Sequence, residues 1–264
     1  MSEKQKVLVT GISGRIGQLV CEHLGDRYDI SGLDRNAFDG VPTRVADIAE
    51  FNAIETAFEG MDVVIHLAGN PSPRAAWEAT LEANIVGTRN VFEAARRAGV
   101  KRIVYASSHH VAGFFGLKQD PWKSVYEGRI GEIRQPLPLL GTDLIRPDSY
   151  YGVSKAFGES LGSYFHDAFG ISVICLRIGW VMTPDDPSFS AASLSLWMSH
   201  RDTIQLFQKS VEAPATVGFA IINGESNNRL GIWDLEPGRR ILGYFPEDDG
   251  GEKWVETPNS PPVI

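Results

Sequence analysis

Short apolar segments alternate along the chain with longer segments in which apolar residues recur at helical spacing. The short segments are rich in Val, Ile and Leu, and the longer ones stop at glycines such as Gly25 and Gly99. Continuously apolar strands that alternate with helices indicate a parallel sheet covered on both faces. The predicted fold class is therefore α/β, a doubly wound parallel sheet of the Rossmann type. Strands are predicted over 6–11, 28–34, 43–48, 61–69, 101–108 and 171–179, and helices over 15–26, 50–60, 77–99 and 150–170.

Two regions depart from this alternation. Residues 114–148 lose the periodicity and gain prolines, which predicts a long loop, and long loops in compact domains are usually functional. The C-terminal part is irregular, with an amphipathic segment over 194–212, a strand-like segment over 218–226 and a proline-rich tail. We expect residues 1–179 to form the Rossmann domain. Residues 180–264 are expected to form a small lobe over the carboxyl ends of the strands, and not an independent domain.

Composition narrows the class of protein further. With 264 residues, 43% hydrophobic and 22% charged, the chain is of ordinary globular composition and long enough for one large domain. Its net charge of -8 argues against nucleic-acid or anionic-membrane partners, which need a concentrated basic surface. No apolar run is long enough to span a bilayer or to act as a signal peptide, so we expect a cytoplasmic location. Cys21 and Cys175 lie in apolar segments, and we expect neither a disulfide nor a metal site.

The segment TGISGRIG joins the first strand to the first helix and places Gly11, Gly14 and Gly17 at GxxGxxG spacing. A tight turn, a close backbone approach to a pyrophosphate and close helix packing each need a missing Cβ, and a helix N-terminus attracts the anion. A glycine-rich turn that binds nothing is the alternative, but the strand–turn–helix context favours a dinucleotide site. The residues expected to contact the cofactor here are Gly11, Ile12, Gly14, Arg15, Ile16 and Gly17.

Asp34 ends the second predicted strand, where a carboxylate can accept hydrogen bonds from the adenosine ribose and repel a 2′-phosphate. This favours NAD. The adjacent Arg35 can instead bind that phosphate, so NADP remains the alternative. Asp47 either approaches the adenine or caps the following helix. The other residues expected around the adenosine are Ile48, Leu67 and Ala68.

Tyr151 and Lys155 lie four residues apart in a predicted helix, so their side chains share one helical face. A nearby ammonium favours phenolate, and a lowered phenol pKa would let Tyr151 act as a general base near neutral pH. The same spacing also occurs by chance on amphipathic helices. Ser107 and Ser108 favour the catalytic interpretation, because they end the preceding strand, where a hydroxyl can hydrogen-bond the reacting oxygen.

These motifs resemble those of the extended short-chain dehydrogenase/reductases, the NAD-dependent epimerase/dehydratase family. The resemblance covers about residues 7–179 and rests on TGISGRIG, the strand-end aspartate, HLAG, the long helix that contains Asn84, YASS, YYGVSK and RIG. It implies that Tyr151, Lys155 and Ser108 take the catalytic positions. The NAD contacts that it adds are Asn84, Tyr151, Lys155 and Ile178.

Within this family, the sequence looks most like a compact branch that includes uronate dehydrogenases and archaeal NAD-dependent glucose-6-phosphate dehydrogenases. The shared segments are SSxHxxGxF, RPxxxYGVSKxxGE, RIG and LxxWxSxRD, and those enzymes oxidise C1 of a cyclic sugar to a lactone. Two positions depart from the uronate pattern. His109 replaces an asparagine, and Ala192 replaces the arginine that holds the sugar carboxylate. Arg74, His200 or Arg201 would then have to supply the positive charge, and a sugar phosphate or a neutral aldose is the alternative substrate.

The histidines and Trp180 bear on the substrate pocket. His109 and His110 are expected to point to opposite sides of an extended backbone, so at most one meets the substrate, and we favour His110. Trp180 either narrows the pocket and stacks on a sugar face or belongs to the core of the lobe. His66 is expected to be structural. The full set of expected substrate residues is Ser72, Arg74, Ser108, His109, His110, Tyr151, Trp180 and Trp197.

The predicted function is that of an NAD-dependent sugar dehydrogenase, which oxidises C1 of a cyclic hexuronate or sugar phosphate to its lactone. Lys155 holds the nicotinamide ribose, and Tyr151, assisted by Ser108, takes the hydroxyl proton while hydride passes to the cofactor. The alternatives are an epimerase that uses the same residues and a non-catalytic dinucleotide-binding regulator. The family resemblance also implies a homodimer or higher homo-oligomer formed by the helices over 77–98 and 150–169.

Overall fold

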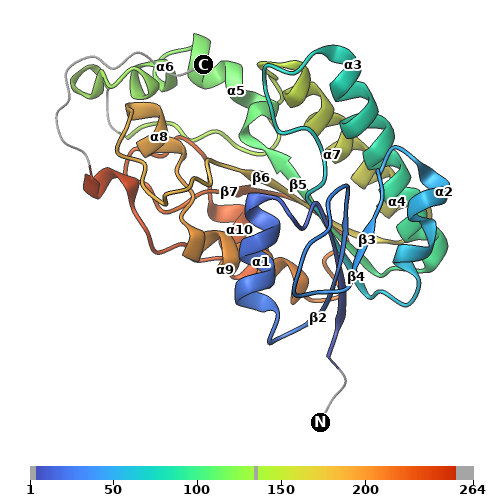
Figure 1. The fold of residues 1–264 in the computed structure, drawn as a ribbon. Coiled ribbons are helices and arrows are strands. Elements are labelled where there is room, and N and C mark those ends of the chain that lie inside the picture. Colours follow the sequence, from blue (N-terminus) through green and yellow to red (C-terminus); the bar gives the residue numbers. More distant parts are fainter. Residues whose placement is uncertain (1–3, 134–135, 254–264) are drawn as a thin grey trace.

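A computed structural model describes residues 4–133 and 136–253. All the strand pairs in this part of the chain are parallel, and they form one sheet in the order β3-β2-β1-β4-β5-β6-β7 (Figure 1). The order reverses between β1 and β4, as in a doubly wound fold, so the predicted α/β class is confirmed. The strands are β1 (Lys6–Thr10), β2 (Asp29–Asp34), β3 (Thr43–Val45), β4 (Val63–His66), β5 (Arg102–Ser108), β6 (Ser172–Ile178) and β7 (Phe219–Gly224).

Helices cover both faces of the sheet (Figure 1). One face carries α1 (Arg15–Leu24), α9 (His200–Val211) and α10 (Glu236–Leu242). The other carries α2 (Phe51–Ile54), α4 (Gly87–Ala98) and α7 (Tyr150–Phe169), and α3 (Trp77–Thr80) runs through a π-helical stretch, Leu81–Val86, into α4. The short helices α5 (Gly113–Lys118), α6 (Trp122–Tyr126) and α8 (Ala191–Leu196) lie above the carboxyl ends of the strands.

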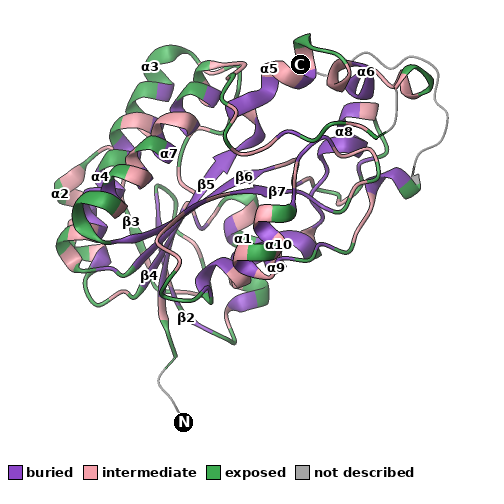
Figure 2. Cartoon of the chain, turned by 180° about the vertical axis from the view of Figure 1, so that it is seen from behind, coloured by how far each residue is buried: buried purple, intermediate pink, exposed green. Residues whose placement is uncertain are grey.

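The central strands β1, β4, β5 and β6 are buried on both faces, whereas the edge strand β3 is partly exposed (Figure 2). On one face they pack against Val20 of α1 and Phe207 of α9, and on the other against Phe92 of α4 and Phe165 of α7. Each such side chain stabilises the fold by about 1.5–3 kcal/mol when it is fully buried. The sheet is therefore a rigid support, and the loops at its carboxyl edge are held in fixed positions.

The region over 114–148, predicted to be a long loop, contains α5 and α6. These helices have too few turns to show a helical period, and their stability comes from a third apolar cluster that includes Val125, Tyr126, Leu140 and Trp233. The prediction of a continuous loop was therefore wrong for this segment.

The C-terminal segment also differs from the prediction. The amphipathic stretch over 194–212 is two helices, because Trp197 is extended, with ψ 137°, and the Ser199 side chain caps a new helix at the backbone N–H of Asp202. The strand expected in the lobe is β7, which pairs with β6 at the edge of the main sheet. The proline-rich tail lies outside the described residues.

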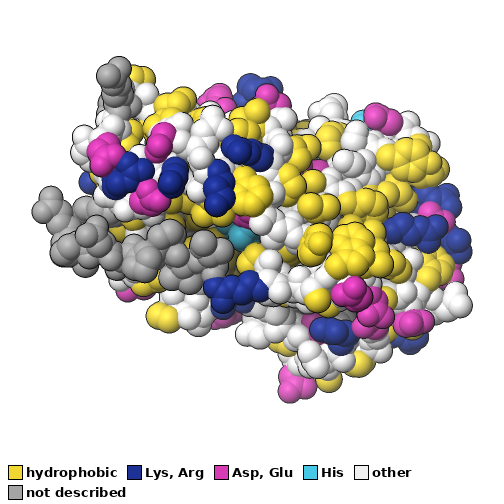
Figure 3. All heavy atoms as spheres, turned by 90° about the horizontal axis from the view of Figure 1, so that it is seen from above, with side chains coloured by type: hydrophobic (Ala, Val, Ile, Leu, Met, Phe, Trp, Pro, Cys, Tyr) yellow, Lys and Arg dark blue, Asp and Glu magenta, His cyan; other side chains and the backbone are white. Residues whose placement is uncertain are grey.

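The end of the molecule above the strands faces the viewer in Figure 3. Hydrophobic side chains gather over much of this face, and Lys and Arg side chains are interspersed with Asp and Glu. Within residues 4–133 and 136–253, no helix combines the length and the apolar character that a membrane span requires.

Candidate active site

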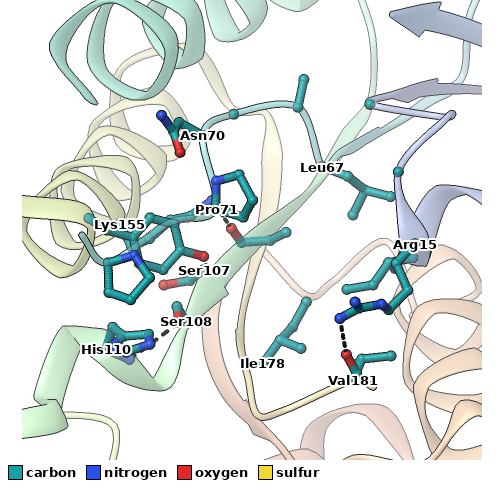
Figure 4. A pocket seen from close by; sticks show the side chains of 18 of the residues that line it. Arg15, Leu67, Asn70, Pro71, Ser107, Ser108, His110, Lys155, Ile178 and Val181 are labelled. Atoms are coloured by element: carbon teal, nitrogen blue, oxygen red, sulfur yellow. Dashed lines mark hydrogen bonds between the residues drawn. The ribbon is translucent and has the colours of Figure 1, made fainter. Parts of the chain in front are cut away.

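A cleft of about 1140 Å³ runs along the carboxyl ends of the strands, which is large enough for a dinucleotide together with a small ligand. It is bordered by the glycine-rich turn, the ends of β2, β4, β5 and β6, and the start of α7 (Figure 4). Ile12, Ser72, Asn84 and Trp197, all expected in the site, are not among the residues that line it. The expected residues that do line it are Gly11, Gly14, Arg15, Ile16, Gly17, Asp34, Arg35, Asp47, Ile48, Leu67, Ala68, Arg74, Ser108, His109, His110, Tyr151, Lys155, Ile178 and Trp180.

The glycine-rich turn forms a backbone cradle at the N-terminus of α1. Gly11 has φ +74°, and a Cβ there would lie 2.7 Å from the Ala68 nitrogen, so only glycine fits. A Cβ on Gly17 would lie 2.5 Å from the Gly11 carbonyl oxygen. The Ile12 side chain is fully buried in the core and supports the turn from beneath, so only its backbone is left for the expected cofactor contact. The cradle suits a pyrophosphate, because the first N–H groups of a helix attract an anion.

Asp34 is held in one orientation at the end of β2. Its Oδ2 accepts hydrogen bonds from the Ser13 backbone N–H at 2.9 Å and the Ser13 hydroxyl at 2.8 Å, and its Oδ1 accepts one from the Asn36 N–H at 3.0 Å. A fixed carboxylate beside the cleft is suited to the hydroxyls of an adenosine ribose. Asp47 lines the cleft, and its Oδ1 accepts from the Ala49 N–H at 2.9 Å in a turn ahead of α2. It does not cap that helix, which has no side-chain hydrogen bond at its N-cap.

Ser108, Tyr151 and Lys155 come together where β5 ends beside the start of α7. The Ser149 hydroxyl caps this helix at the Gly152 N–H, 3.1 Å away. Lys155 Nζ donates to the Ala106 carbonyl oxygen at 2.7 Å and lies 5.4 Å from the centre of the Tyr151 ring. The sequence prediction that the serine, phenol and ammonium converge is therefore matched by the geometry.

Burial is the main cause of the shifted pKa values of Tyr151 and Lys155. It raises the pKa of Tyr151 to about 12, although a hydrogen bond from Ser108 acts in the opposite direction. It lowers the pKa of Lys155 to about 8. The pKa of the phenol is thus raised and not lowered as expected, because the loss of hydration dominates and the charge of Asp148 acts in the same direction.

His110 is paired with a carboxylate that sequence reasoning missed. Its Nδ1 donates to Asp148 Oδ2 at 2.8 Å, and its ring lies 5.5 Å from that of Tyr151. The expectation that His109 and His110 point apart was wrong: their rings are 4.2 Å apart, because residues His109–Ala112 form a 3-10 turn and not an extended strand. Figure 4 shows His110 beside Ser108, with Arg15 across the cleft bonded to the Val181 carbonyl.

Asn84 lies behind the cleft, where its side-chain amide connects two segments by hydrogen bonds, and it does not line the cleft. Its Oδ1 accepts from the Asn70 N–H at 2.6 Å, and its Nδ2 donates to the Asn70 carbonyl and to the Ser154 hydroxyl, both at 3.0 Å. These bonds tie the loop after β4 to α7. The expected direct cofactor contact from Asn84 is thus replaced by a supporting role, since its amide is fully used by the protein.

His66 supports the cofactor side of the cleft from within the core, as expected. Its Nδ1 shares a hydrogen bond with the Thr10 hydroxyl at 2.8 Å, and its Nε2 shares one with the Thr88 hydroxyl at 3.1 Å. Thr10 also accepts from the Ala68 N–H at 3.2 Å, in the loop that lines the cleft. Burial, with the charge of Lys155 as a smaller cause, lowers the pKa of His66 to about 3.

The segment after β6 forms one wall of the cleft, and this wall is largely aromatic. The Trp180 indole is stacked on Phe189 with ring centroids 6.1 Å apart and an interplanar angle of 7°. Its Nε1 donates to His109 Nε2 at 3.2 Å. Ala192 is part of the same wall. Trp197, expected to contact substrate, instead donates its Nε1 to Asp185 at 2.8 Å and supports the wall from behind.

One of three side chains, Arg74, His200 or Arg201, was expected to supply the positive charge that an arginine at position 192 would provide. Arg201 is exposed and pairs with Glu247 and Asp248, and His200 donates to the Met182 carbonyl oxygen at 2.6 Å. Neither lines the cleft. Arg74 does line it, from the loop after β4 on the opposite side.

Comparison with known proteins identifies the family. A profile of the NAD dependent epimerase/dehydratase family matches residues 7–201. The chain belongs to this family. It is 37% identical to NAD-dependent glucose-6-phosphate dehydrogenase of Haloferax volcanii, over 96% of this chain and 97% of that protein. It is 35% identical to L-arabinose 1-dehydrogenase (NAD(P)(+)) of the same organism, over 92% and 97%. A mutant uronate dehydrogenase from Agrobacterium tumefaciens, solved in complex with NAD, superimposes with a TM-score of 0.78 at 32% identity, over 94% and 86% of the chains.

Several lining residues of this epimerase/dehydratase family member were missed by sequence reasoning, among them Asn70, Asp148 and Phe189. Asp148 stands three residues before Tyr151 in the segment that carried the motif, so its position was a usable signal. Phe189 lies in an irregular stretch, and no local pattern distinguishes it from Trp197. Within the described ranges, no cluster of His, Cys, Asp and Glu is arranged to hold a metal ion.

Proposed function

We propose that the protein is an NAD-dependent dehydrogenase that oxidises C1 of a cyclic aldose to its lactone. The observation that carries this proposal is the convergence of Ser108, Tyr151 and Lys155 in the same cleft as the glycine cradle and Asp34. Two relatives with more than one third identity along nearly the whole chain are named as sugar dehydrogenases, and one of them is a 1-dehydrogenase.

The cofactor residues fit NAD. The cradle at residues 11–17 would hold the pyrophosphate, and the fixed carboxylate of Asp34 would accept from the adenosine ribose hydroxyls. Arg35 lines the cleft beside Asp34, so use of NADP as a second cofactor is part of the test. NAD, when bound, supplies the acceptor for the hydride that leaves C1.

The chain's own residues handle the proton. Tyr151 takes the proton of the C1 hydroxyl as the carbonyl bond of the lactone forms, and Ser108 donates a hydrogen bond to the same oxygen. Lys155, on the same face of α7, stabilises the phenolate that Tyr151 must become. Burial excludes water from these groups, and the Ala106 carbonyl keeps the ammonium in position.

Cofactor binding and catalysis on one side, and substrate binding on the other, are assigned to different parts of the chain. Residues 1–179 carry the cofactor cradle and the catalytic group, and the segment that begins at Trp180 supplies the substrate wall. His110, fixed by Asp148, is the residue that we assign to a hydrogen bond with the sugar.

The test is the appearance of NADH at 340 nm with purified protein, NAD and a panel of aldoses, uronates and sugar phosphates. We expect Tyr151→Phe to lower turnover by about 10²–10⁴-fold, the usual contribution of a general base, without loss of NAD binding. Tyr150→Phe is the matched control, because this neighbouring tyrosine is 55% exposed. Isomerised sugar without net NADH would instead indicate an epimerase, and function retained in Tyr151→Phe would indicate a regulator.

We also propose that the protein is cytoplasmic and forms a homodimer or higher homo-oligomer through α3, the π-helical stretch after it, and α7. Exposed apolar side chains on these elements support this: Trp77, Leu81, Val86, Tyr150, Val153, Tyr164 and Phe169. An apolar surface of this kind is typical of a protein contact. Light scattering should give a multiple of the 29.0 kDa chain mass, and Val153→Glu should shift it toward the monomer.

A further inference from the structure

The side chains of Trp180, Phe189 and His109 form a wall whose side-chain polar atoms are bonded within the protein. His109 Nδ1 donates to the Ile178 carbonyl oxygen at 3.2 Å, and His109 Nε2 accepts from Trp180 Nε1 at 3.2 Å. The hydrogen-bonding capacity of both the imidazole and the indole is thereby used within the protein. What Trp180 presents is its aromatic face, extended by the stacked ring of Phe189.

Three further residues of this wall are apolar. Ala192, Leu196 and Val181 line the cleft beside the aromatic pair. Burial holds the pKa of His109 well below its ordinary value, so the ring is neutral near pH 7. Arg15, the cation on the adjoining loop, donates one hydrogen bond to the Val181 carbonyl at 2.7 Å, and we assign its remaining donors to the cofactor side of the cleft, at the start of α1.

The wall is fixed, which prevents it from adapting to a charged group. The Trp180 N–H donates to the Leu196 carbonyl at 2.7 Å, and the Met198 N–H donates to the Trp180 carbonyl at 3.1 Å. The loop that carries Phe189 is tied at Asp185, which accepts from the Trp197 indole at 2.8 Å and from the His200 N–H at 2.9 Å.

We propose that this wall makes the enzyme selective for a neutral aldose, one without a carboxylate or phosphate at the end remote from C1. An anion placed against the wall would lose its hydration without gaining a partner, whereas the C–H face of a neutral sugar packs on an aromatic ring. The proposal rests on the dehydrogenase function above and narrows its substrate class. Of the substrates expected from the sequence, it favours the neutral aldose over a hexuronate or a sugar phosphate.

Arg74 provides the competing arrangement. It is exposed on the loop across the cleft and could bind an anionic sugar that turns its charged end away from the wall. Arg74→Ala separates the two cases, because it would impair the oxidation of charged sugars only if that arrangement is used.

The experiment measures kcat/KM with NAD for two matched pairs, D-galactose against D-galacturonate and D-glucose against D-glucose 6-phosphate, with L-arabinose as a small neutral aldose. We expect the neutral member of each pair to be favoured by at least about tenfold, the scale on which a mismatched group is rejected by a pocket. Ala192→Arg, which adds a cation to the wall, should shift both ratios toward the charged sugar.

A preference for the charged member of either pair, lost in Arg74→Ala, would overturn the selectivity and leave the dehydrogenase intact. Absence of NADH with every sugar, while NAD still binds, would overturn both. The wild-type ratios decide the question without any variant, so a failure of Ala192→Arg to fold does not affect the test.

Discussion

The buried imidazole of His66 should make the protein sensitive to acid. Its neutral form is satisfied, because one ring nitrogen donates and the other accepts in the bonds to the Thr10 and Thr88 hydroxyls. A second proton makes both nitrogens donors, so the hydroxyl that had donated to the ring loses its acceptor. Thr10 also accepts from the Ala68 N–H, so the loop that lines the cofactor cleft would lose part of its support.

The magnitude follows from proton linkage. The pKa of His66 is about 3 in the folded protein, below the ordinary value of about 6.5 in an unfolded chain. The unfolded state therefore binds the proton more readily between these values, and stability is present above about pH 6.5 and lost as the pH falls. At pH 5 this loss is about 2 kcal/mol, and a folded pKa one unit higher gives nearly the same loss.

The assay is urea unfolding at pH 8 and pH 5, followed by tryptophan fluorescence. His66→Gln keeps a donor and an acceptor but cannot be protonated, so the pH-dependent loss should be smaller by about 2 kcal/mol than in the wild type. His23→Gln, at an exposed position of α1, is the control. An equal loss in wild type and His66→Gln would refute the reasoning. NAD should raise the midpoint at pH 5, because it binds the folded state.

Three further substitutions test the cofactor site and its support. Asp34→Ala should raise the KM for NAD and reduce the preference for NAD over NADP by at least about tenfold in steady-state kinetics, and an unchanged ratio would remove Asp34 from the ribose site. Arg177→Met should lower the free energy of unfolding by about 3–5 kcal/mol, because it leaves the Glu159 carboxylate buried without the guanidinium that is now 2.8 Å away. Adding Glu159→Leu to this variant should restore most of the lost stability. Gly17→Ala should weaken NAD binding, measured by calorimetry, by more than about tenfold, since the added Cβ would lie 2.5 Å from the Gly11 and Ile12 carbonyl oxygens. An unchanged affinity for NAD would contradict this close-packing argument.

The parts of the site that the sequence predicted are those determined locally. Strand, turn and helix follow each other within residues 6–24, so the glycine spacing carries the geometry of the cradle with it. Tyr151 and Lys155 share a face because a helix has a fixed period. Ser108 could be placed beside them because the carboxyl ends of parallel strands lie at one edge of the sheet.

The parts that could not be predicted depend on contacts between distant segments. Trp180 and Trp197 pair through their backbones, and this pairing decides that the first faces the cleft and the second faces the protein. The protonation of Tyr151 depends on how deeply the folded chain buries it, which the four-residue spacing does not encode. Asn84 was expected at the cofactor, but its amide is used by a loop and a helix that the sequence does not place relative to each other.

The position of β7 has a consequence for how such an enzyme can diverge. Because β7 returns to the sheet beside β6, the segment between them is a crossover whose two ends are anchored in the same rigid frame. Residues 179–218 can therefore be exchanged between relatives as one cassette, with the dinucleotide half left untouched. Changes of sugar preference within this architecture then require neither a new cofactor site nor a new catalytic group. A chimaera made at these two boundaries should have the substrate specificity of the relative that supplies residues 179–218.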